Sequence, residues 1–333
     1  MKLIVKIEIV LLVIVVLVGA FMVLAAEGVF ELFYEPVIAQ REAAPIPTDA
    51  PEEPVVLPET TLPATAEEAK DISRSITADN YFAYDIRQDA YLAKLGDSAE
   101  KLYPASITKL LTSYVVLQHM DPEETVKVGD ALNLVQPDSS LAKLQAGDEL
   151  TVSQLIAGMM LPSGNDAAQT IAVATGRKLG GSNLPYYEAV DVFVEEMNRQ
   201  AELLGMTNSH FANPDGFHHD DHYTSMDDLV TLCKALLADP VMMGYVSRMQ
   251  ETVETKGRTL EWDNTNLLLH DGTELYRENA MGMKTGYTRM AGNCLISAFF
   301  EEDRVILIGV FGCPGFTEDR YYDTVAIYDS VSK

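Results

Sequence analysis

The pattern of apolar and polar residues divides the 333-residue chain into three stretches. Residues 9–26 are uncharged and almost entirely apolar, and residues 27–70 combine prolines with acidic residues. From about residue 71 onward, short apolar runs alternate with polar turns, as is typical of a globular domain. We therefore expect a signal peptide or N-terminal membrane anchor over 1–26, an acidic, proline-rich linker over 27–70 and one folded domain over 71–333.

The apolar segment near the N-terminus is long enough to nearly span a bilayer core. Lys2 and Lys6 precede it and acidic residues follow it, which places the N-terminus inside and the rest of the chain outside under the positive-inside rule. Residues 23–25, Val-Leu-Ala, also offer a cleavage pattern of small residues. We expect a retained anchor, and a cleaved signal peptide remains the alternative.

Alternating apolar runs predict two β-hairpins at opposite ends of the domain. The first joins "NYFAYDI" to "AYLAKL" through residues 87–89, and the second joins "NCLISAFF" to "RVILIGVFG" through the acidic turn 301–303. Helical patterns fill the sequence between them. This arrangement predicts an antiparallel sheet covered by helices.

Helical periodicity and capping residues predict five helices. Residues 106–119 are apolar on all sides, which indicates a buried helix. Thr151 can cap the next helix, which Pro162 ends, and Gly176 is expected to stop the one after it. Further helices are expected from about 188 to 204 and over 317–331, the last with Tyr321, Val325 and Tyr328 on one face.

Composition excludes several functional classes. The formal net charge of −26 provides no basic surface for nucleic acid, so a nucleic-acid partner is not expected. The three cysteines, Cys233, Cys294 and Cys313, form no CxxC pair. We interpret them as buried thiols rather than as a disulfide framework or a zinc site.

Three short motifs carry the candidate chemistry. In "PASITKLLT", Lys109 follows Ser106 by one helical turn, so a desolvated amine with a lowered pKa can accept the serine proton. A Ser-x-x-Lys pattern is also expected about once by chance in a chain of this length. In that case the two residues would be an ordinary serine and lysine on a helix. Ser163 and Asn165 in "LPSGND", and Lys284, Thr285 and Gly286 in "GMKTGYT", follow in order. Three such motifs in this order are very improbable by accident.

With these motifs, the chain resembles the serine D-Ala-D-Ala carboxypeptidases, or low-molecular-mass penicillin-binding proteins, from Ile76 to the end. The resemblance extends to the longer stretches "ELTVSQLIAGMMLPSGNDAAQTIA", "MNRQAELLGMTNSHFANPDGF" and "MGMKTGYTRMAGNCLISA". The resemblance implies an α+β, penicillin-recognising fold like that of the serine β-lactamases and D,D-peptidases. A five-stranded antiparallel sheet flanked by helices would adjoin a mostly helical subdomain, with the active site between them. Residues 71–333 would be the catalytic domain.

The resemblance also implies roles for the motif residues. Ser106 would be the acylated nucleophile, Lys109 its base, Ser163 the relay of the proton to the leaving D-alanine, and Asn165 the residue that holds the substrate amide and Lys109. The substrate side would be formed by Lys284, Thr285, Gly286, Tyr287 and Arg320. Lys284 would supply positive potential, Thr285 and Arg320 would bind the terminal carboxylate, and the N–H groups of Ser106 and Tyr287 would form the oxyanion hole.

The function that the resemblance implies is removal of the terminal D-alanine from peptidoglycan pentapeptides through an acyl-enzyme, with no cofactor. β-Lactams should acylate Ser106. The enzyme would act at the extracytoplasmic face of the bacterial cell membrane, held by its N-terminal segment, or be secreted if that segment is cleaved. Many relatives add a β-rich C-terminal domain with a membrane helix, whereas this sequence ends soon after its last predicted helix, so attachment is expected at the N-terminus.

Other functions remain open at this point. A D,D-endopeptidase or a β-lactamase-like hydrolase could share this fold, although Gly164 stands where class A β-lactamases carry aspartate. A penicillin-binding scaffold without turnover is a third alternative. The histidines and aspartates of "FHHDDHY", residues 217–223, could suggest a metal-dependent peptidase. Their adjacency on a loop argues against coordination, and His222 with Tyr223 matches a structural pair of the family.

Overall fold

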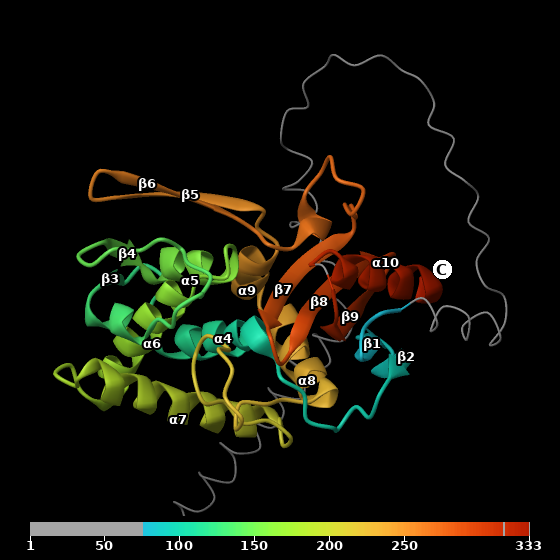
Figure 1. The fold of residues 1–333 in the computed structure, drawn as a ribbon, viewed down its shortest axis with the longest axis horizontal. Coiled ribbons are helices and arrows are strands. Elements are labelled where there is room, and N and C mark those ends of the chain that lie inside the picture. The colour runs from blue at the N-terminus through green and yellow to red at the C-terminus, as the bar shows by residue number, and fades with distance from the viewer. Residues whose placement is uncertain (1–75, 316, 333) are drawn as a thin grey trace, which may run out of the picture. The chain divides into compact units, whose positions relative to one another are not determined.

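The computed structural model describes residues 76–315 and 317–332 (Figure 1). The predicted anchor and linker lie outside the described residues, so both stay predictions. Within the described part, no single helix has the length and hydropathy of a membrane span. One bent pair of helices, Met226–Leu237 and Pro240–Val246, meets those two criteria together, with a bend of 108° between them.

A five-stranded antiparallel sheet unites the two ends of the described chain (Figure 1). Its strands, in the order β2-β1-β9-β8-β7, are β2 (Ala90–Leu95), β1 (Asn80–Asp85), β9 (Arg304–Cys313), β8 (Gly292–Glu301) and β7 (Ala280–Thr288). Both predicted hairpins are confirmed, and β1 of the first pairs with β9 of the second. Within the expected antiparallel sheet, two strands that are more than 200 residues apart in sequence therefore pair side by side.

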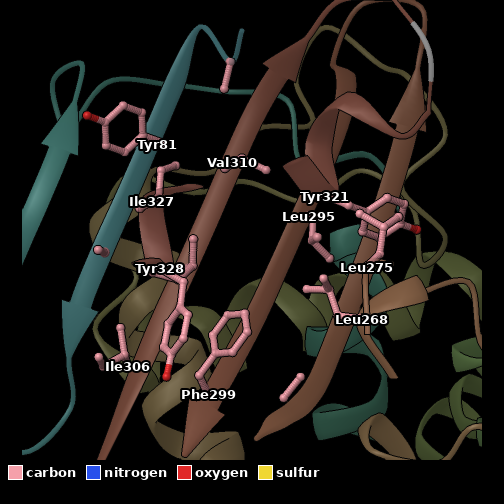
Figure 2. Close-up of a cluster of buried hydrophobic side chains, with 14 of the residues drawn as sticks. Tyr81, Leu268, Leu275, Leu295, Phe299, Ile306, Val310, Tyr321, Ile327 and Tyr328 are labelled. Carbon is pink, nitrogen blue, oxygen red and sulfur yellow. The ribbon is translucent and has the colours of Figure 1, made fainter. Parts of the chain in front are cut away.

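Helix α10 (Asp319–Val331) covers one face of this sheet (Figure 2). Tyr321, Ile327 and Tyr328 pack in one cluster with residues of β8 and β9, and the rings of Phe299 and Tyr328 stack with centroids 4.3 Å apart. Val325 is partly buried at the edge of the cluster. The predicted apolar face of the last helix is thus confirmed.

Helix α8 (Met226–Leu237) lies on the opposite face of the sheet. Side chains alternate between the faces of a strand, and Tyr81 of β1 belongs to the cluster under α10. Tyr84 therefore points the other way, where its ring contacts Tyr91 edge-on. The hydroxyl of Tyr91 donates to Asp227 of α8 at 2.5 Å. Burial on both faces explains why β9 is a nearly continuous apolar run.

The helical part of the domain adjoins edge strand β7 (Figure 1). It contains the 3-10 helices η1 (Ala105–Thr108) and η2 (Asp130–Leu134), and helices α4 (Lys109–His119), α5 (Val152–Met160), α6 (Asn165–Gly180), α7 (Tyr186–Leu204) and α9 (Pro240–Val246). Thr151 forms the predicted cap of α5, as a capping box with Gln154. The expected buried helix over 106–119 begins as a 3-10 turn and becomes α-helical only at Lys109.

The predicted helix stop at Gly176 is wrong, because α6 continues to Gly180. A Cβ at Gly176 would lie 1.8 Å from the carbonyl oxygen of Ala189 in α7. The glycine therefore permits close packing of two helices. The helix ends at Gly181, whose φ of +133° only glycine adopts readily.

Two small two-stranded sheets were not predicted. One pairs β3 (Thr125–Lys127) with β4 (Glu149–Thr151), and the other pairs β5 (Gln250–Thr255) with β6 (Arg258–Asp263). The β5–β6 hairpin extends away from the large sheet, on the side of α5 and β4 (Figure 1). Trp262 anchors it there, because its indole Nε1 donates to the carbonyl oxygen of Ala142 at 2.8 Å.

All three cysteines are buried and unpaired, as expected. Burial raises the pKa of the Cys294 thiol to about 11 and also raises the pKa values of Cys233 and Cys313. The three thiols are therefore protonated and inert in the folded protein.

Candidate active site

The first motif lies where η1 passes into α4, beside strand β7. Ala105 adopts a φ of +49°, a conformation that residues other than glycine rarely take, and the next residue is Ser106. The hydroxyl of Thr108 donates to the carbonyl oxygen of Ala105 at 2.8 Å and closes this turn. A Cβ at Gly286 would approach the backbone nitrogen of Ser106 to 3.1 Å. The glycine of the third motif thus allows β7 to approach the serine closely.

Lys109 is fully buried and points its amine at three oxygens. Nζ lies 2.9 Å from Ser106 Oγ, 2.8 Å from Asn165 Oδ1 and 2.7 Å from the carbonyl oxygen of Asp215. An ammonium group can donate to all three. A neutral amine donates to two of them and accepts the third hydrogen bond from the hydroxyl of Ser106. The same contacts therefore suit the amine before and after it takes the serine proton.

Burial lowers the pKa of Lys109 from 10.5 to about 8. The carboxylates of Asp215 and Asp166 oppose this effect, because negative charge favours the ammonium form. With a pKa of about 8, roughly one tenth of the amine is neutral at pH 7. The group therefore has the pKa that a general base needs.

The second motif forms the turn between α5 and α6. Ser163 is buried and has a φ of +61°, a second strained position at this site. Asn165 is the first residue of α6, and its Nδ2 donates to Ser139 Oγ at 3.0 Å while its Oδ1 accepts from Lys109. These two partners fix the orientation of the amide. The structure thus brings the side chains of Ser106, Lys109 and Asn165 together.

The third motif lies inside β7, whereas the sequence indicated that it leads into a strand. Lys284 is fully buried, and its Nζ donates to the carbonyl oxygen of Thr285 at 3.1 Å. Burial, followed by the positive charges of Lys109 and Arg320, lowers the pKa of Lys284 well below 10.5. Repulsion between two buried ammonium groups is mutual, so it favours a state in which one of the two amines is neutral.

Arg320 lies in the first turn of α10 and is only 8% exposed. Its Nη1 donates to the carbonyl oxygen of Gly286 at 3.2 Å, which places the guanidinium against the third motif. Within the described residues its buried Nε has no hydrogen-bond partner. The guanidinium of Arg320 thus lies against Gly286, the residue after Thr285. Tyr287 follows on β7 with a side chain that is 61% exposed.

Sequence reasoning missed Asp215. Its carbonyl oxygen accepts from Lys109, and its carboxylate accepts from Gln169 Nε2 and from the backbone N–H of Phe217, both at 2.8 Å. A backbone contact leaves no trace in residue type. The one available signal was the turn sequence "NPDG", in which Gly216 has a φ of +80°.

Sequence reasoning also missed the loop that carries Ser139. The carboxylate of Asp166 accepts from the backbone N–H groups of Ala142 at 2.7 Å and Leu144 at 2.9 Å, and so fixes this loop to the start of α6. Thr265 was missed as well. Its hydroxyl lies 2.6 Å from that of Thr285.

One histidine of the stretch 217–223 supports the turn that carries Ser106. His222 is buried, and its Nδ1 accepts from the backbone N–H of Ala212 at 3.1 Å. Nε2 must therefore carry the proton, and it donates to Thr108 Oγ1 at 2.7 Å. Over residues 76–315 and 317–332, no group of three or more His, Cys, Asp or Glu side chains is arranged to hold a metal ion.

Comparison with known proteins agrees with this geometry. The sequence profile of peptidase S11, described as D-alanyl-D-alanine carboxypeptidase, matches residues 64–314, well over half of the chain. The chain belongs to the peptidase S11 family. It is 33% identical over 246 residues to the D-alanyl-D-alanine carboxypeptidase DacA of Escherichia coli K12, which covers 71% of this chain and 56% of DacA. It is 29% identical over 221 residues to DacF of Bacillus subtilis, which covers 65% of this chain and 52% of DacF.

This S11 family member thus spans about half the length of the curated relatives that it matches. Among solved structures, it resembles the Streptomyces K15 DD-transpeptidase with a TM-score of 0.68 and 28% identity, over 77% of this chain and 97% of that one. Penicillin-binding protein D2 of Listeria monocytogenes, solved in a cefotaxime-bound form, gives a TM-score of 0.62 and 25% identity over 77% and 97% of the two chains. The predicted fold class is confirmed.

Proposed function

We propose that the protein is a serine D-Ala-D-Ala carboxypeptidase that removes the terminal D-alanine of peptidoglycan stem peptides. The observation that carries the proposal is the buried amine of Lys109, 2.9 Å from the hydroxyl of Ser106. Burial of an ammonium group is costly even when it is hydrogen-bonded, so the place of this amine beside a serine hydroxyl has a catalytic explanation. Membership of the S11 family supports the same reaction.

The contacts suggest how acylation proceeds. Neutral Lys109 accepts the proton of Ser106, and Oγ attacks the carbonyl carbon of the penultimate D-alanine. The N–H groups of Ser106 and Tyr287 are proposed to bind the oxyanion. When the tetrahedral intermediate collapses, the C–N bond breaks, and Ser163 passes the proton from Lys109 to the leaving amine of D-alanine. Water then attacks the ester, and the shortened peptide leaves with Ser106 restored.

Three cationic or polar groups are proposed to bind the free carboxylate of the substrate. Lys284 and Arg320 concentrate positive charge at this place in a chain whose net charge is −26. Nζ of Lys284 lies 3.5 Å from Thr285 Oγ1, and Nη1 of Arg320 donates to the carbonyl oxygen of the next residue, Gly286. This arrangement favours a substrate that ends in a carboxylate. A β-lactam acid presents a similar carboxylate beside a reactive amide, so we propose that β-lactams acylate Ser106.

Incubation of the full chain with a defined muropeptide pentapeptide, followed by mass spectrometry, tests the proposal. Release of one D-alanine, lost in Ser106→Ala and unaffected by a chelator, is expected. Cleavage only of cross-linked dimers would instead indicate an endopeptidase, and rapid hydrolysis of penicillin a β-lactamase-like enzyme. Penicillin uptake without any turnover would indicate a scaffold. Loss of D-alanine release on addition of the chelator would indicate the metal-dependent alternative.

We propose further that residues 1–26 anchor the enzyme at the extracytoplasmic face of the cell membrane. The apolar run after Lys2 and Lys6 supports this placement. N-terminal sequencing of the mature protein from membrane and soluble fractions tests it. An intact N-terminus in the membrane fraction is expected, whereas a mature chain that begins after residue 25 in the soluble fraction would show a cleaved signal peptide.

A further inference from the structure

Thr265 lies at a junction of three parts of the site, although no motif contains it. Its backbone N–H donates to the carbonyl oxygen of Leu161 at 3.0 Å, at the end of α5 and two residues before Ser163. Its carbonyl oxygen accepts from the hydroxyl of Tyr321 in α10. Its own hydroxyl lies 2.6 Å from that of Thr285 in β7. The residue is thus positioned by its backbone on both sides, and its side chain faces the third motif.

The direction of the hydrogen bond between the two threonine hydroxyls affects how Thr285 meets an anion. If Thr285 donates to Thr265, its proton is taken, and it offers only lone pairs to a carboxylate. If Thr265 donates to Thr285, the proton of Thr285 is free to point at the carboxylate. Lys284 Nζ, 3.5 Å from Thr285 Oγ1, is also a donor toward that oxygen. If Thr265 and Lys284 both donate to Thr285 Oγ1, the proton of Thr285 is left free for another acceptor.

The surroundings of Thr265 link it to Arg320 as well. Nη2 of Arg320 donates to the hydroxyl of Tyr321 at 3.3 Å, and that hydroxyl donates in turn to the carbonyl oxygen of Thr265. The two groups that are expected to bind the substrate carboxylate, Thr285 and Arg320, are therefore both connected to this one residue. A shared support of this kind fixes the distance between them.

We propose that Thr265 is a positioning residue, whose hydroxyl directs the proton of Thr285 toward the terminal carboxylate of the substrate and so selects substrates with a free carboxyl end. The inference rests on the proposed function, because it refines how the same site recognises its substrate. It assigns the role to a side chain outside all three motifs. Hydrogen bonds to a charged group are stronger than those between neutral groups, so the effect should appear with the acid and not with its ester.

Thr265→Val is a suitable test variant. Valine has nearly the shape of threonine, and the two backbone hydrogen bonds of residue 265 do not need the hydroxyl. The fold should therefore be retained, which circular dichroism and the melting temperature can verify. Thr265→Ser is the matched control, because it restores a hydroxyl at the same position while removing only a methyl group.

The experiment compares the full chain and both variants with a labelled penicillin acid and with its methyl ester, and with an acyl-D-Ala-D-Ala peptide. For Thr265→Val we expect kcat/KM on the peptide and the acylation rate by the acid to fall about 10- to 100-fold, mainly through KM. Acylation by the ester should change by less than about threefold. Thr265→Ser should recover most of the loss.

An equal fall with acid and ester, no change with either, or no rescue by serine would overturn the inference and show at most a packing role for Thr265. These outcomes differ from failure of the proposed function. That failure would be seen in the unaltered protein, as absence of both D-alanine release and penicillin uptake, and it would overturn the inference with it.

Discussion

Lys109 Nζ and the carbonyl oxygen of Asp215 lie 2.7 Å apart, although the residues are separated by 106 positions in the chain. This carbonyl also lies 3.4 Å from Ser106 Oγ. A carbonyl oxygen cannot lose or gain a proton, so it holds the amine in place whatever the charge of the amine. The loop that carries Asp215 therefore helps to position the amine, although no motif contains it.

Gly216 provides a direct test of that loop. It has a φ of +80°, and a Cβ there would lie 1.8 Å from the carbonyl oxygen of Ala105 and 2.9 Å from the nitrogen of Ser106. Gly216→Ala must therefore displace either the nucleophile turn or the carbonyl that holds Lys109. We expect penicillin acylation to fall by about 100-fold or more, which a loss of roughly 3 kcal/mol would produce.

Gly257→Ala is the matched control for Gly216→Ala. Gly257 has a similar φ of +75°, and an added Cβ meets nothing within 4 Å. Both variants place alanine in the left-handed region at a cost of about 1 to 2 kcal/mol, but only one of them clashes with η1. Equal loss of acylation in the two variants would contradict the role given to the Asp215 loop.

The rate of acylation should depend on pH through Lys109. The amine accepts the serine proton only when it is neutral, and burial lowers its pKa to about 8. The rate at saturating penicillin should therefore rise about tenfold per pH unit below pH 8 and level off above it. Stopped-flow measurements over pH 5.5–10 check this expectation. A rate independent of pH below 8 would exclude Lys109 as the base.

Asp166 should affect both the loop at the site and the base. Its carboxylate accepts from Ala142 and Leu144, and its charge raises the pKa of Lys109. Asp166→Asn presents an N–H to backbone donors, so we expect a loss of about 2 kcal/mol in the free energy of unfolding. The inflection of the acylation rate should also move to lower pH. Asp138→Asn, at an exposed position before the same loop, removes the same charge and should change neither quantity.

His222 should make the fold sensitive to acid. Burial lowers its pKa from 6.5 to about 3, so below pH 6.5 the unfolded chain binds a proton that the folded protein does not. The contribution to stability is fully present above pH 6.5 and declines as the pH falls toward 3, by at most about 1.4 kcal/mol per unit. Urea unfolding of the protein and of His222→Gln at several pH values measures this. The free energy of unfolding should fall more steeply with falling pH in the unaltered protein than in the variant, and the two slopes should agree above pH 7. Equal slopes at pH 4–6 would contradict this role of His222.

Much of this site could be predicted because its side chains act through fixed local spacing. One helical turn from Ser106 to Lys109 and one turn between Ser163 and Asn165 are local geometry. The antiparallel sheet could be predicted from the apolar runs of β8 and β9 on either side of an acidic turn, and from the resemblance to the family. These features depend on residues near each other in sequence or on apolar periodicity.

The rest depends on contacts that sequence patterns do not record. Gly176 marks a close helix contact, although glycine more often marks a helix end. Asp215 contributes a backbone carbonyl oxygen, which residue type does not reveal. Thr265 meets Thr285 because the 3-10 helix η3 (Leu267–Leu269), which follows Thr265 closely in the chain, lies beside β7. The β5–β6 hairpin did carry a signal, since Lys256-Gly257 separates two alternating runs, and the prediction overlooked it.

The β5–β6 hairpin is connected to the candidate active site through the backbone of one residue. The indole of Trp262 donates to the carbonyl oxygen of Ala142, and the carboxylate of Asp166 accepts from the N–H of the same residue, so the backbone of this one residue links the β5–β6 hairpin to the start of α6. Asn165, whose Oδ1 accepts from Lys109 Nζ, begins that helix. We therefore expect mutations in the β5–β6 hairpin to shift Asn165 and its contact with Lys109, although every motif residue is preserved.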